Sequence, residues 1–161
     1  MAARTGREKQ VYKGSIRQVS FNNYFNCLKE IEKPVAGCVP INKATGEILL
    51  ITSTSGDGWV LPKGGWEDDE TQQEAAARET YEEAGARGKL SFIGIWDPKK
   101  TGISHATFIF FEMEVDKLED KWPEMDVRDR QWFSYDDAIK ILKKPFMRQV
   151  VEHCSLAPSN N

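Results

Sequence analysis

The chain has 161 residues, about the length of one domain, and we expect a single domain with a core over about 33–154 and loose ends at 1–10 and 157–161. Hydrophobic residues make up 40% of it and charged residues 29%, proportions that can bury a core and that exclude a disordered, collagen-like or low-complexity chain. The formal net charge of −3 argues against duplex binding through a wholly basic surface, but a local basic pocket is compatible with it.

The first predicted elements are strands. Residues 35–41 and 47–54 are rich in Val, Ile and Leu, and the turn residues NKATG between them indicate that the two strands are neighbours. Residues 58–61 end before a proline, which favours extended backbone at the preceding residue. We therefore expect a short strand edge there, followed by a loop over 63–70.

A helix is predicted from Thr71 onward. Thr71 and Glu74 have the spacing of a capping box, in which each residue satisfies a free backbone amide of the other. Three alanines follow directly, and Gly85 stands where a left-handed C-cap residue belongs. Both ends of this helix are therefore marked by local signals.

The second half of the chain alternates strands with helices. The predicted elements are strands over 90–96, 105–115 and 131–133, a helix over 136–143 and a further helix after Pro145, with the polar turn DPKKTG joining the first two strands. Ser134 is expected to cap the first of these helices, with Asp137 as its capping-box partner. Strands interleaved with helices predict an α/β fold, an α/β/α sandwich on a mixed sheet.

Three carboxylates occupy one face of the helix that begins at Thr71. Glu79 and Glu83 are four residues apart and Glu82 is three from Glu79, so their like charges repel unless a cation lies among them. A hard divalent cation suits such oxygen ligands, and Mg²⁺ in particular takes one or two carboxylates together with waters and substrate phosphates. Arg78 is placed to brace Glu82. The alternative interpretation is a charge run on an ordinary solvated helix.

The spacing of these residues decides between the two interpretations. The segment reads G-x5-E-x7-R-E-x-x-E-E-x-G, with its fixed positions at Gly64, Glu70, Arg78, Glu79, Glu82, Glu83 and Gly85. This pattern resembles the signature of the Nudix hydrolase family. The chain departs from the usual family pattern at Thr80 and Ala86, where larger aliphatic residues are common, and this concerns local packing more than chemistry.

The resemblance implies a Nudix α/β/α sandwich with a loop-helix-loop motif that holds Mg²⁺ or Mn²⁺ and hydrolyses a nucleoside diphosphate linked to another moiety, or a similar phosphoanhydride. By position it implies that Glu79 and Glu83 are the main metal ligands. Glu82 would be a further ligand or the base that activates water, and the carbonyl of Gly64 would also face the metal. Arg78 would assist these carboxylates, while Glu70 and Gly85, the two other fixed positions, would be structural.

The flanking sequence bears on the substrate. The stretches VAGC (35–38), WVLPKGGWEDDE (59–70) and RQWFSYDDAIKIL (130–142) are similar to the diphosphoinositol polyphosphate phosphohydrolase subfamily, whose members also cleave diadenosine polyphosphates such as diadenosine hexaphosphate. The alternatives are another Nudix substrate, such as ADP-ribose, a nucleoside triphosphate or a capped RNA end, and a noncatalytic phosphate-binding module. The intact glutamates disfavour the last of these.

A substrate with many phosphate charges requires cations that converge on one pocket. The candidate substrate-binding residues are Lys33, Ser53, Ser55, Lys63, His105, Arg128, Arg130 and Lys144. For the cations the alternative is a plain surface charge, for the serines a turn, and for the histidine a structural hydrogen bond. Among the aromatic residues, core packing is the ordinary role, and Trp66 is the candidate to line a pocket.

The sequence also bears on compartment and partners. The three cysteines, Cys27, Cys38 and Cys154, lack C-x-x-C spacing, which disfavours a disulfide framework or a zinc site and favours a reducing compartment. No apolar run approaches the ~20 residues of a membrane span, and the first ten residues lack the apolar stretch of a secretory signal. We expect a cytoplasmic or nuclear monomer that acts on a small polyphosphate, without a membrane or an extended nucleic acid as partner.

Overall fold

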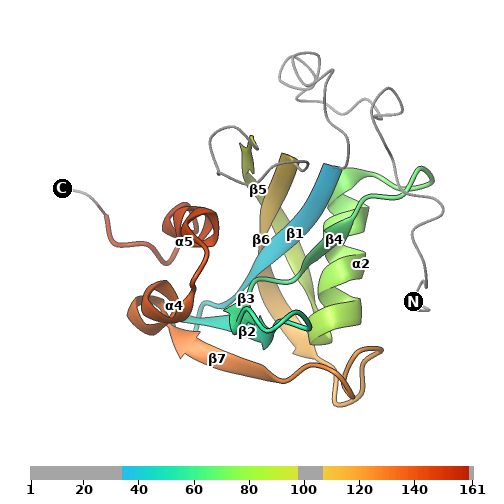
Figure 1. Ribbon diagram of the computed structural model, residues 1–161. Helices are drawn as coiled ribbons and strands as arrows, with labels where there is room; N and C mark the ends of the chain where they lie inside the picture. The colour runs from blue at the N-terminus through green and yellow to red at the C-terminus, as the bar shows by residue number, and fades with distance from the viewer. Residues whose placement is uncertain (1–33, 98–106, 160–161) are drawn as a thin grey trace.

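The computed structural model describes residues 34–97 and 107–159. Figure 1 shows the elements, which are β1 (Pro34–Asn42), β2 (Glu47–Thr52), β3 (Trp59–Val60), β4 (Lys63–Gly65), α2 (Gln72–Ala84), β5 (Ala86–Trp96), β6 (Thr107–Leu118), β7 (Arg130–Ser134), α4 (Tyr135–Ile141) and α5 (Pro145–Glu152). Within these residues no helix is long and apolar enough to cross a membrane.

The strands of the described residues form one seven-stranded mixed sheet. Its main order is β3-β2-β1-β6-β5, while β4 pairs with β1 and β7 pairs with β2. The central pair, β1 and β6, is parallel from Pro34↔Thr107 to Ile41↔Glu114, and the other pairs are antiparallel. Helix α2 covers one side of the sheet, and α4 and α5 lie on the other (Figure 1). The predicted α/β/α sandwich is confirmed.

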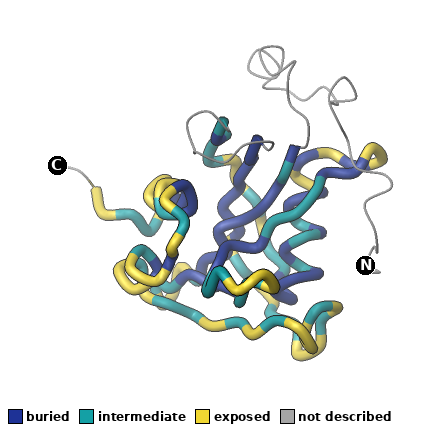
Figure 2. Tube along the Cα trace, in the orientation of Figure 1, coloured by how far each residue is buried: buried dark blue, intermediate teal, exposed yellow. Residues whose placement is uncertain are grey.

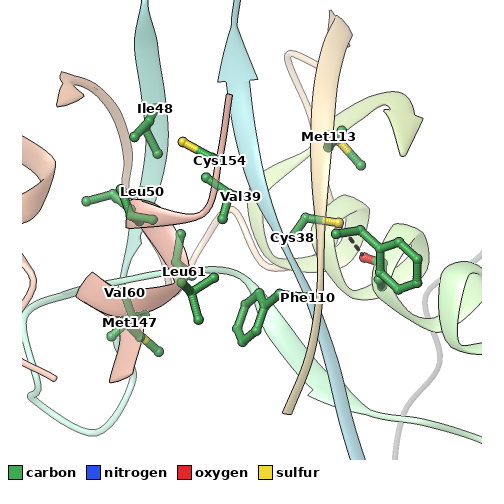
Figure 3. Close-up of a cluster of buried hydrophobic side chains, with 14 of the residues drawn as sticks. Cys38, Val39, Ile48, Leu50, Val60, Leu61, Phe110, Met113, Met147 and Cys154 are labelled. Atoms are coloured by element: carbon green, nitrogen blue, oxygen red, sulfur yellow. Dashed lines mark hydrogen bonds between the residues drawn. The ribbon is translucent and has the colours of Figure 1, made fainter. Parts of the chain in front are cut away.

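The core lies on both sides of β1 and β6, which are dark along most of their length in Figure 2. On one side Phe110, Leu61 and Met147 of α5 pack together (Figure 3). On the other, the buried thiol of Cys38 donates a hydrogen bond of 3.6 Å to the carbonyl of Ala76 in α2. Burial raises the pKa of this thiol to about 12, which keeps it protonated. The sheet and α2 are thus joined by close packing.

Trp66, the aromatic residue singled out as the candidate to line a pocket, has instead the core-packing role expected of the aromatic residues in general. Its side chain is 0% exposed, and its indole Nε1 donates to the carbonyl of Glu70 at 2.6 Å. The indole ring of Trp66 removes more apolar surface from water when it packs beneath the loop than it would if it lined an open pocket. The residue fixes the loop that precedes α2.

The element boundaries differ from the predicted ones where pairing, and not local pattern, decides them. Strand β4 lies inside the segment predicted as a loop, because Lys63–Gly65 pairs with Val35–Gly37 of β1. Strand β5 begins at Ala86, directly after the helix cap, because Ala86 pairs with Leu118 at the far end of β6. Ser134 caps α4 as predicted, accepting from the amide of Asp137 at 3.1 Å. The turn after Asp97 and the start of the strand predicted over 105–115 lie outside the described residues.

Candidate active site

Helix α2 is held at both ends as its local sequence predicts. The Thr71 hydroxyl accepts from the amide of Glu74 at 3.1 Å, and the Glu74 carboxylate accepts from the amide of Thr71 at 3.2 Å. At the other end Gly85 has φ 67°, in the left-handed region that glycine adopts readily. These caps fix the register in which Glu79 and Glu83 face β4.

Arg78 is the hub of the carboxylate face. Its Nε and Nη2 donate to the two oxygens of Glu70 at 3.0 and 2.8 Å, and Nη2 also donates to the carbonyl of Gly65 at 2.9 Å. Its Nη1 donates to Glu79 at 2.8 Å and to Glu82 at 3.3 Å. Both Arg78 and Glu70 are buried, so the bonds are formed in a medium where they are strong. The guanidinium thereby orders two of the three predicted metal-site carboxylates.

Glu79 lies directly over the backbone of Gly64. A Cβ at position 64 would occupy the space of the Glu79 carboxyl group, so a larger residue at this position is incompatible with the observed arrangement. The Glu79 side chain is only 13% exposed. Burial raises its pKa to about 7, against the opposing charge of Arg78. A carboxylate in this position is costly to ionise without a further cation.

Glu83 lies one turn further along the same face, and its two oxygens have different partners. One oxygen accepts from the backbone amide of Lys63 at 3.0 Å, and the other accepts from Nη2 of Arg128 at 3.1 Å. Burial raises the pKa of Glu83 to about 8, Arg128 lowers it, and the charge of Glu79 raises it further. The two glutamates predicted as main metal ligands therefore both hold their protons more tightly than an exposed glutamate.

Cations line the other side of these carboxylates. Lys63 lies near Glu83, Lys144 and Arg128. Burial lowers the pKa of Lys63, the charge of Glu83 raises it, and the charges of Lys144 and Arg128 lower it, so that the pKa is lowered overall. Lys144 also forms an ion pair of 3.3 Å with Asp57. Three of the predicted substrate-binding cations are thus brought together beside the predicted metal-site carboxylates.

The two predicted serines adjoin this cationic group. The hydroxyls of Ser53 and Ser55 are 2.9 Å apart, and Ser55 donates to Asp57 at 3.0 Å. Asp57 is the partner of Lys144, and the bonds to Ser55 and Lys144 lower the pKa of its carboxyl group. The loop between β2 and β3 is therefore linked by hydrogen bonds and an ion pair to the residue that precedes α5.

Comparison with known proteins places this site in a family. Residues 32–154 match the model of the NUDIX domain, and this range contains α2, the loop before it and all the strands described above. The chain belongs to the NUDIX domain family. Its intact carboxylate motif and its relatives support a pyrophosphatase activity of the NUDIX type.

Curated relatives are found in plants and in mouse. Nudix hydrolase 4 of Arabidopsis thaliana is 36% identical over 74% of this chain, and the match spans 64% of that relative. Nudix hydrolase 13, mitochondrial, from the same plant is 34% identical over 94% of the chain and 80% of the relative. Diphosphoinositol polyphosphate phosphohydrolase 3-alpha of Mus musculus is 37% identical over 70% of the chain and 71% of the relative.

A solved structure of the family agrees with the fold. The crystal structure of a NUDIX hydrolase from Nitrosomonas europaea superimposes with a TM-score of 0.62, covering 76% of this chain and 69% of that one. The sequence identity is 22%, so this likeness bears on the fold.

The departure from the usual NUDIX pattern at Thr80 is accommodated within α2, because the buried Thr80 hydroxyl donates to the carbonyl of Ala76 at 2.8 Å.

NUDIX hydrolases generally use divalent metals such as Mg²⁺, and the donor set here fits such an ion. Within 34–97 and 107–159, no three His, Cys, Asp or Glu side chains converge closely enough to hold a metal by themselves. Mg²⁺ does not require such a cage, because it binds through one or two carboxylates and keeps waters and substrate oxygens as its other ligands. Glu79 and Glu83 supply two carboxyl groups whose pKa values are raised mainly by burial, so a cation bound beside them would favour their ionised form.

Arg128, just before β7, and Arg130, the first residue of β7, contact different groups in the same turn of α2. Arg128 contacts the carboxylate of Glu83, whereas Nη1 of Arg130 donates to the carbonyl of Ala84 at 2.9 Å. Arg130 also lies over the ring of Trp122, with 3.8 Å from its Cζ to the ring centroid. The sequence did not single out Trp122, because the carbonyl that its indole contacts, that of Glu83, is 39 residues away and leaves no local signal.

Two predicted substrate-binding residues, Lys33 and His105, lie outside the described residues, as does Cys27. The described cysteines, Cys38 and Cys154, are buried free thiols.

Proposed function

We propose that this chain is a metal-dependent phosphoanhydride hydrolase that removes the β-phosphate of diphosphoinositol polyphosphates and cleaves diadenosine polyphosphates such as diadenosine hexaphosphate. The observation that carries the proposal is the juxtaposition of two buried carboxylates, Glu79 and Glu83, with the cations Lys63, Arg128 and Lys144. The carboxylates suit a hard cation, and the cations suit a substrate with several phosphate groups.

In this proposal Glu79 and Glu83 hold Mg²⁺ or Mn²⁺, with Glu82 and the carbonyl of Gly64 as further oxygen donors. When bound, the metal activates water and neutralises charge on the leaving phosphate. Arg78 orients Glu79 and Glu82 through the hydrogen bonds described above. Glu82, the third carboxylate of the face, is the candidate to accept the proton of the attacking water.

The phosphates that are not cleaved are bound by the cationic side of the site. Lys63 and Lys144 neutralise them, and the Ser53 and Ser55 hydroxyls are hydrogen-bond donors at the end of β2. A bound phosphate would compete with Asp57 for Lys144, so binding exchanges one anionic partner for another. Outside the described residues, Lys33 and His105 remain candidates for the same role.

The substrate class rests on two supports. One is the similarity of the segments around the motif to the diphosphoinositol polyphosphate phosphohydrolase subfamily, together with the 37% identity to the mouse member. The other is the chemistry of the cationic group. The other relatives above are named only as Nudix hydrolases, and one is named mitochondrial, so the cytoplasmic or nuclear location stays a prediction.

The test is to incubate the full chain and Mg²⁺ with a diphosphoinositol polyphosphate and, in parallel, with diadenosine hexaphosphate. Glu83→Gln serves as the blank. Phosphate release from the inositol compound, or cleavage of both, supports the proposal. If the chain instead hydrolyses only ADP-ribose, a nucleoside triphosphate or capped RNA, the proposed substrates are wrong but the proposed phosphoanhydride hydrolysis stands. A wild-type chain that binds these polyphosphates without turnover would show a noncatalytic module.

A further inference from the structure

The last turn of α2 has an unusual set of hydrogen-bond partners. Helix C-termini leave four backbone carbonyls without partners inside the helix. Here the carbonyls at the end of α2 and at its cap accept from the Glu124 amide (3.0 Å), the Trp122 indole (3.1 Å), the Arg130 guanidinium (2.9 Å) and the Glu119 amide (2.8 Å). These donors belong to β7 and the connection before it, and not to the residues that directly follow the helix.

Two of these donors are side chains that also contact each other. The indole Nε1 of Trp122 donates to the carbonyl of Glu83, and Nη1 of Arg130 donates to that of Ala84. The guanidinium lies 3.8 Å above the Trp122 ring, which favours a cation there. Each side chain therefore holds the other in place over the helix end.

The charge of Arg130 suits this position. The carbonyl end of a helix carries partial negative charge, which cations stabilise and anions destabilise. The last four residues of α2, Tyr81–Ala84, include two glutamates and no basic residue. Arg130 brings from β7 the cation that the helix lacks at its own end.

The cap residue leaves room for this arrangement. A Cβ at Gly85 would lie 2.6 Å from Nη1 of Arg130 and 2.9 Å from Cβ of Trp122. The two side chains therefore pack directly on the cap, where the positive φ of 67° also favours glycine. The helix end and its partners form one closely packed unit.

We propose that Trp122 and Arg130 form a clamp that fixes the last turn of α2 and so positions Glu83 for the metal. The clamp holds the backbone of Glu83 and its neighbour, while Arg128 and the Lys63 amide hold the Glu83 carboxylate. Both are positioning residues, and Arg130 is assigned here to the helix and not to substrate phosphate. This inference rests on the proposed metal role of Glu83.

The test measures metal binding without substrate. Mn²⁺ affinity is determined by electron paramagnetic resonance for the full chain and for Arg130→Met, which keeps the length of the side chain but removes its donors and charge. Trp122→Phe keeps the ring and removes only the indole donor. Arg148→Met is the matched control, because the Arg148 guanidinium likewise donates to backbone carbonyls, those of Leu142 and Lys143, on the other side of the sheet from α2. Amide hydrogen exchange over 79–85 gives a second readout.

We expect Arg130→Met and Trp122→Phe each to weaken Mn²⁺ binding by about tenfold, as loss of groups that orient metal ligands does elsewhere. Exchange over 79–85 should quicken in both, whereas Arg148→Met should behave as wild type. At saturating metal the KM of Arg130→Met for diadenosine hexaphosphate should stay within about twofold. Wild-type Mn²⁺ affinity in Arg130→Met with a raised KM would overturn the inference and assign Arg130 to the substrate.

Two further outcomes are separable. If Arg130→Met does not fold, Trp122→Phe decides alone, and unchanged affinity and exchange in that variant would refute the clamp. If Glu83→Gln retains wild-type Mn²⁺ affinity, the metal role of Glu83 in the proposed function is wrong. The clamp would then lose its link to the metal even where exchange confirms that it fixes the helix end.

Discussion

Arg78 binds both carboxylate oxygens of Glu70, through Nε at 3.0 Å and Nη2 at 2.8 Å. Glu70 also accepts from the amide of Glu67 at 3.0 Å, so the pair fastens the loop before α2 to the helix. The remaining nitrogen of Arg78 is then directed at Glu79 and Glu82. The position of two of the proposed metal-site carboxylates thus depends on a pair whose acidic member lies outside the helix.

Removal of Arg78 should cost both stability and activity. Arg78→Gln leaves Glu70 buried without its cationic partner and Glu79 and Glu82 without their shared donor. Breaking a buried ion pair from one side typically costs about 3–5 kcal/mol. We expect a loss of that order in the free energy of unfolding by urea, and no detectable turnover.

Lys117→Gln is the control, because Lys117 pairs with Glu119 near the surface and the Lys117 side chain is 65% exposed. A loss of less than about 1 kcal/mol is expected there. An equal effect of the two variants would contradict the role of the buried network.

Gly64→Ala should disable the metal site while leaving the fold in place. The added methyl group would occupy the position of the Glu79 carboxyl group, which must move away. We expect Mn²⁺ binding to weaken by about tenfold or more, as for other displaced ligands.

Gly46→Ala is the control, since an added Cβ at Gly46 would meet open space and only the positive φ of 73° is unfavourable there. It should lose about 1 kcal/mol of stability from the left-handed backbone and keep wild-type metal affinity. Unchanged Mn²⁺ affinity in Gly64→Ala would show that Glu79 does not bind the metal in the position seen here.

Local signals explain why α2 and its carboxylates could be predicted. The capping box at Thr71 and Glu74 and the glycine at 85 mark the helix ends within the sequence itself, and helical periodicity then places the glutamates on one face. The Arg78–Glu70 pair was also within reach, since both residues belong to the motif.

Features that depend on distant pairing could not be predicted in this way. Strand β4 has only three residues, two of them glycines, and forms because β1 pairs with it. The contacts of Trp122 and Arg130 with α2 join residues 39 and 46 positions apart. Core packing is the ordinary role of an aromatic residue, but the position of Trp66 in the motif loop says nothing of the direction of its ring, which the buried packing of the loop determines.

Lys63→Ala should affect substrate binding more than chemistry. Its side chain lies beside Lys144 and Arg128, whereas its backbone amide is what contacts Glu83, and the substitution keeps that amide. Loss of one charge-assisted contact to phosphate should raise KM for diadenosine hexaphosphate by about tenfold or more, with a much smaller change in kcat. Lys43→Ala, which removes an exposed lysine paired with Glu114, is the control. If KM is unchanged in Lys63→Ala while the control is also silent, Lys63 does not contact the substrate.

The metal-free protein should become less stable as pH rises, and Mg²⁺ should reverse this. Burial raises the pKa of Glu79 to about 7 and that of Glu83 to about 8, from an ordinary value of 4.5. Above pH 4.5 the unfolded chain therefore releases protons that the native state keeps, and this contribution to stability is lost as pH rises through 7 and 8.

A metal ion must displace the same protons, so its affinity should increase over that range. We expect the rise in Tm on adding Mg²⁺ to be larger near pH 8.5 than near pH 6, and calorimetric titrations near pH 6 in two buffers of different ionisation enthalpy to show proton release. The double variant Glu79→Gln, Glu83→Gln should lose both effects. A Tm gain that is equal at the two pH values would mean that these carboxylates do not couple protons to the metal, because every ligand whose pKa lies between them must lose its proton before it binds.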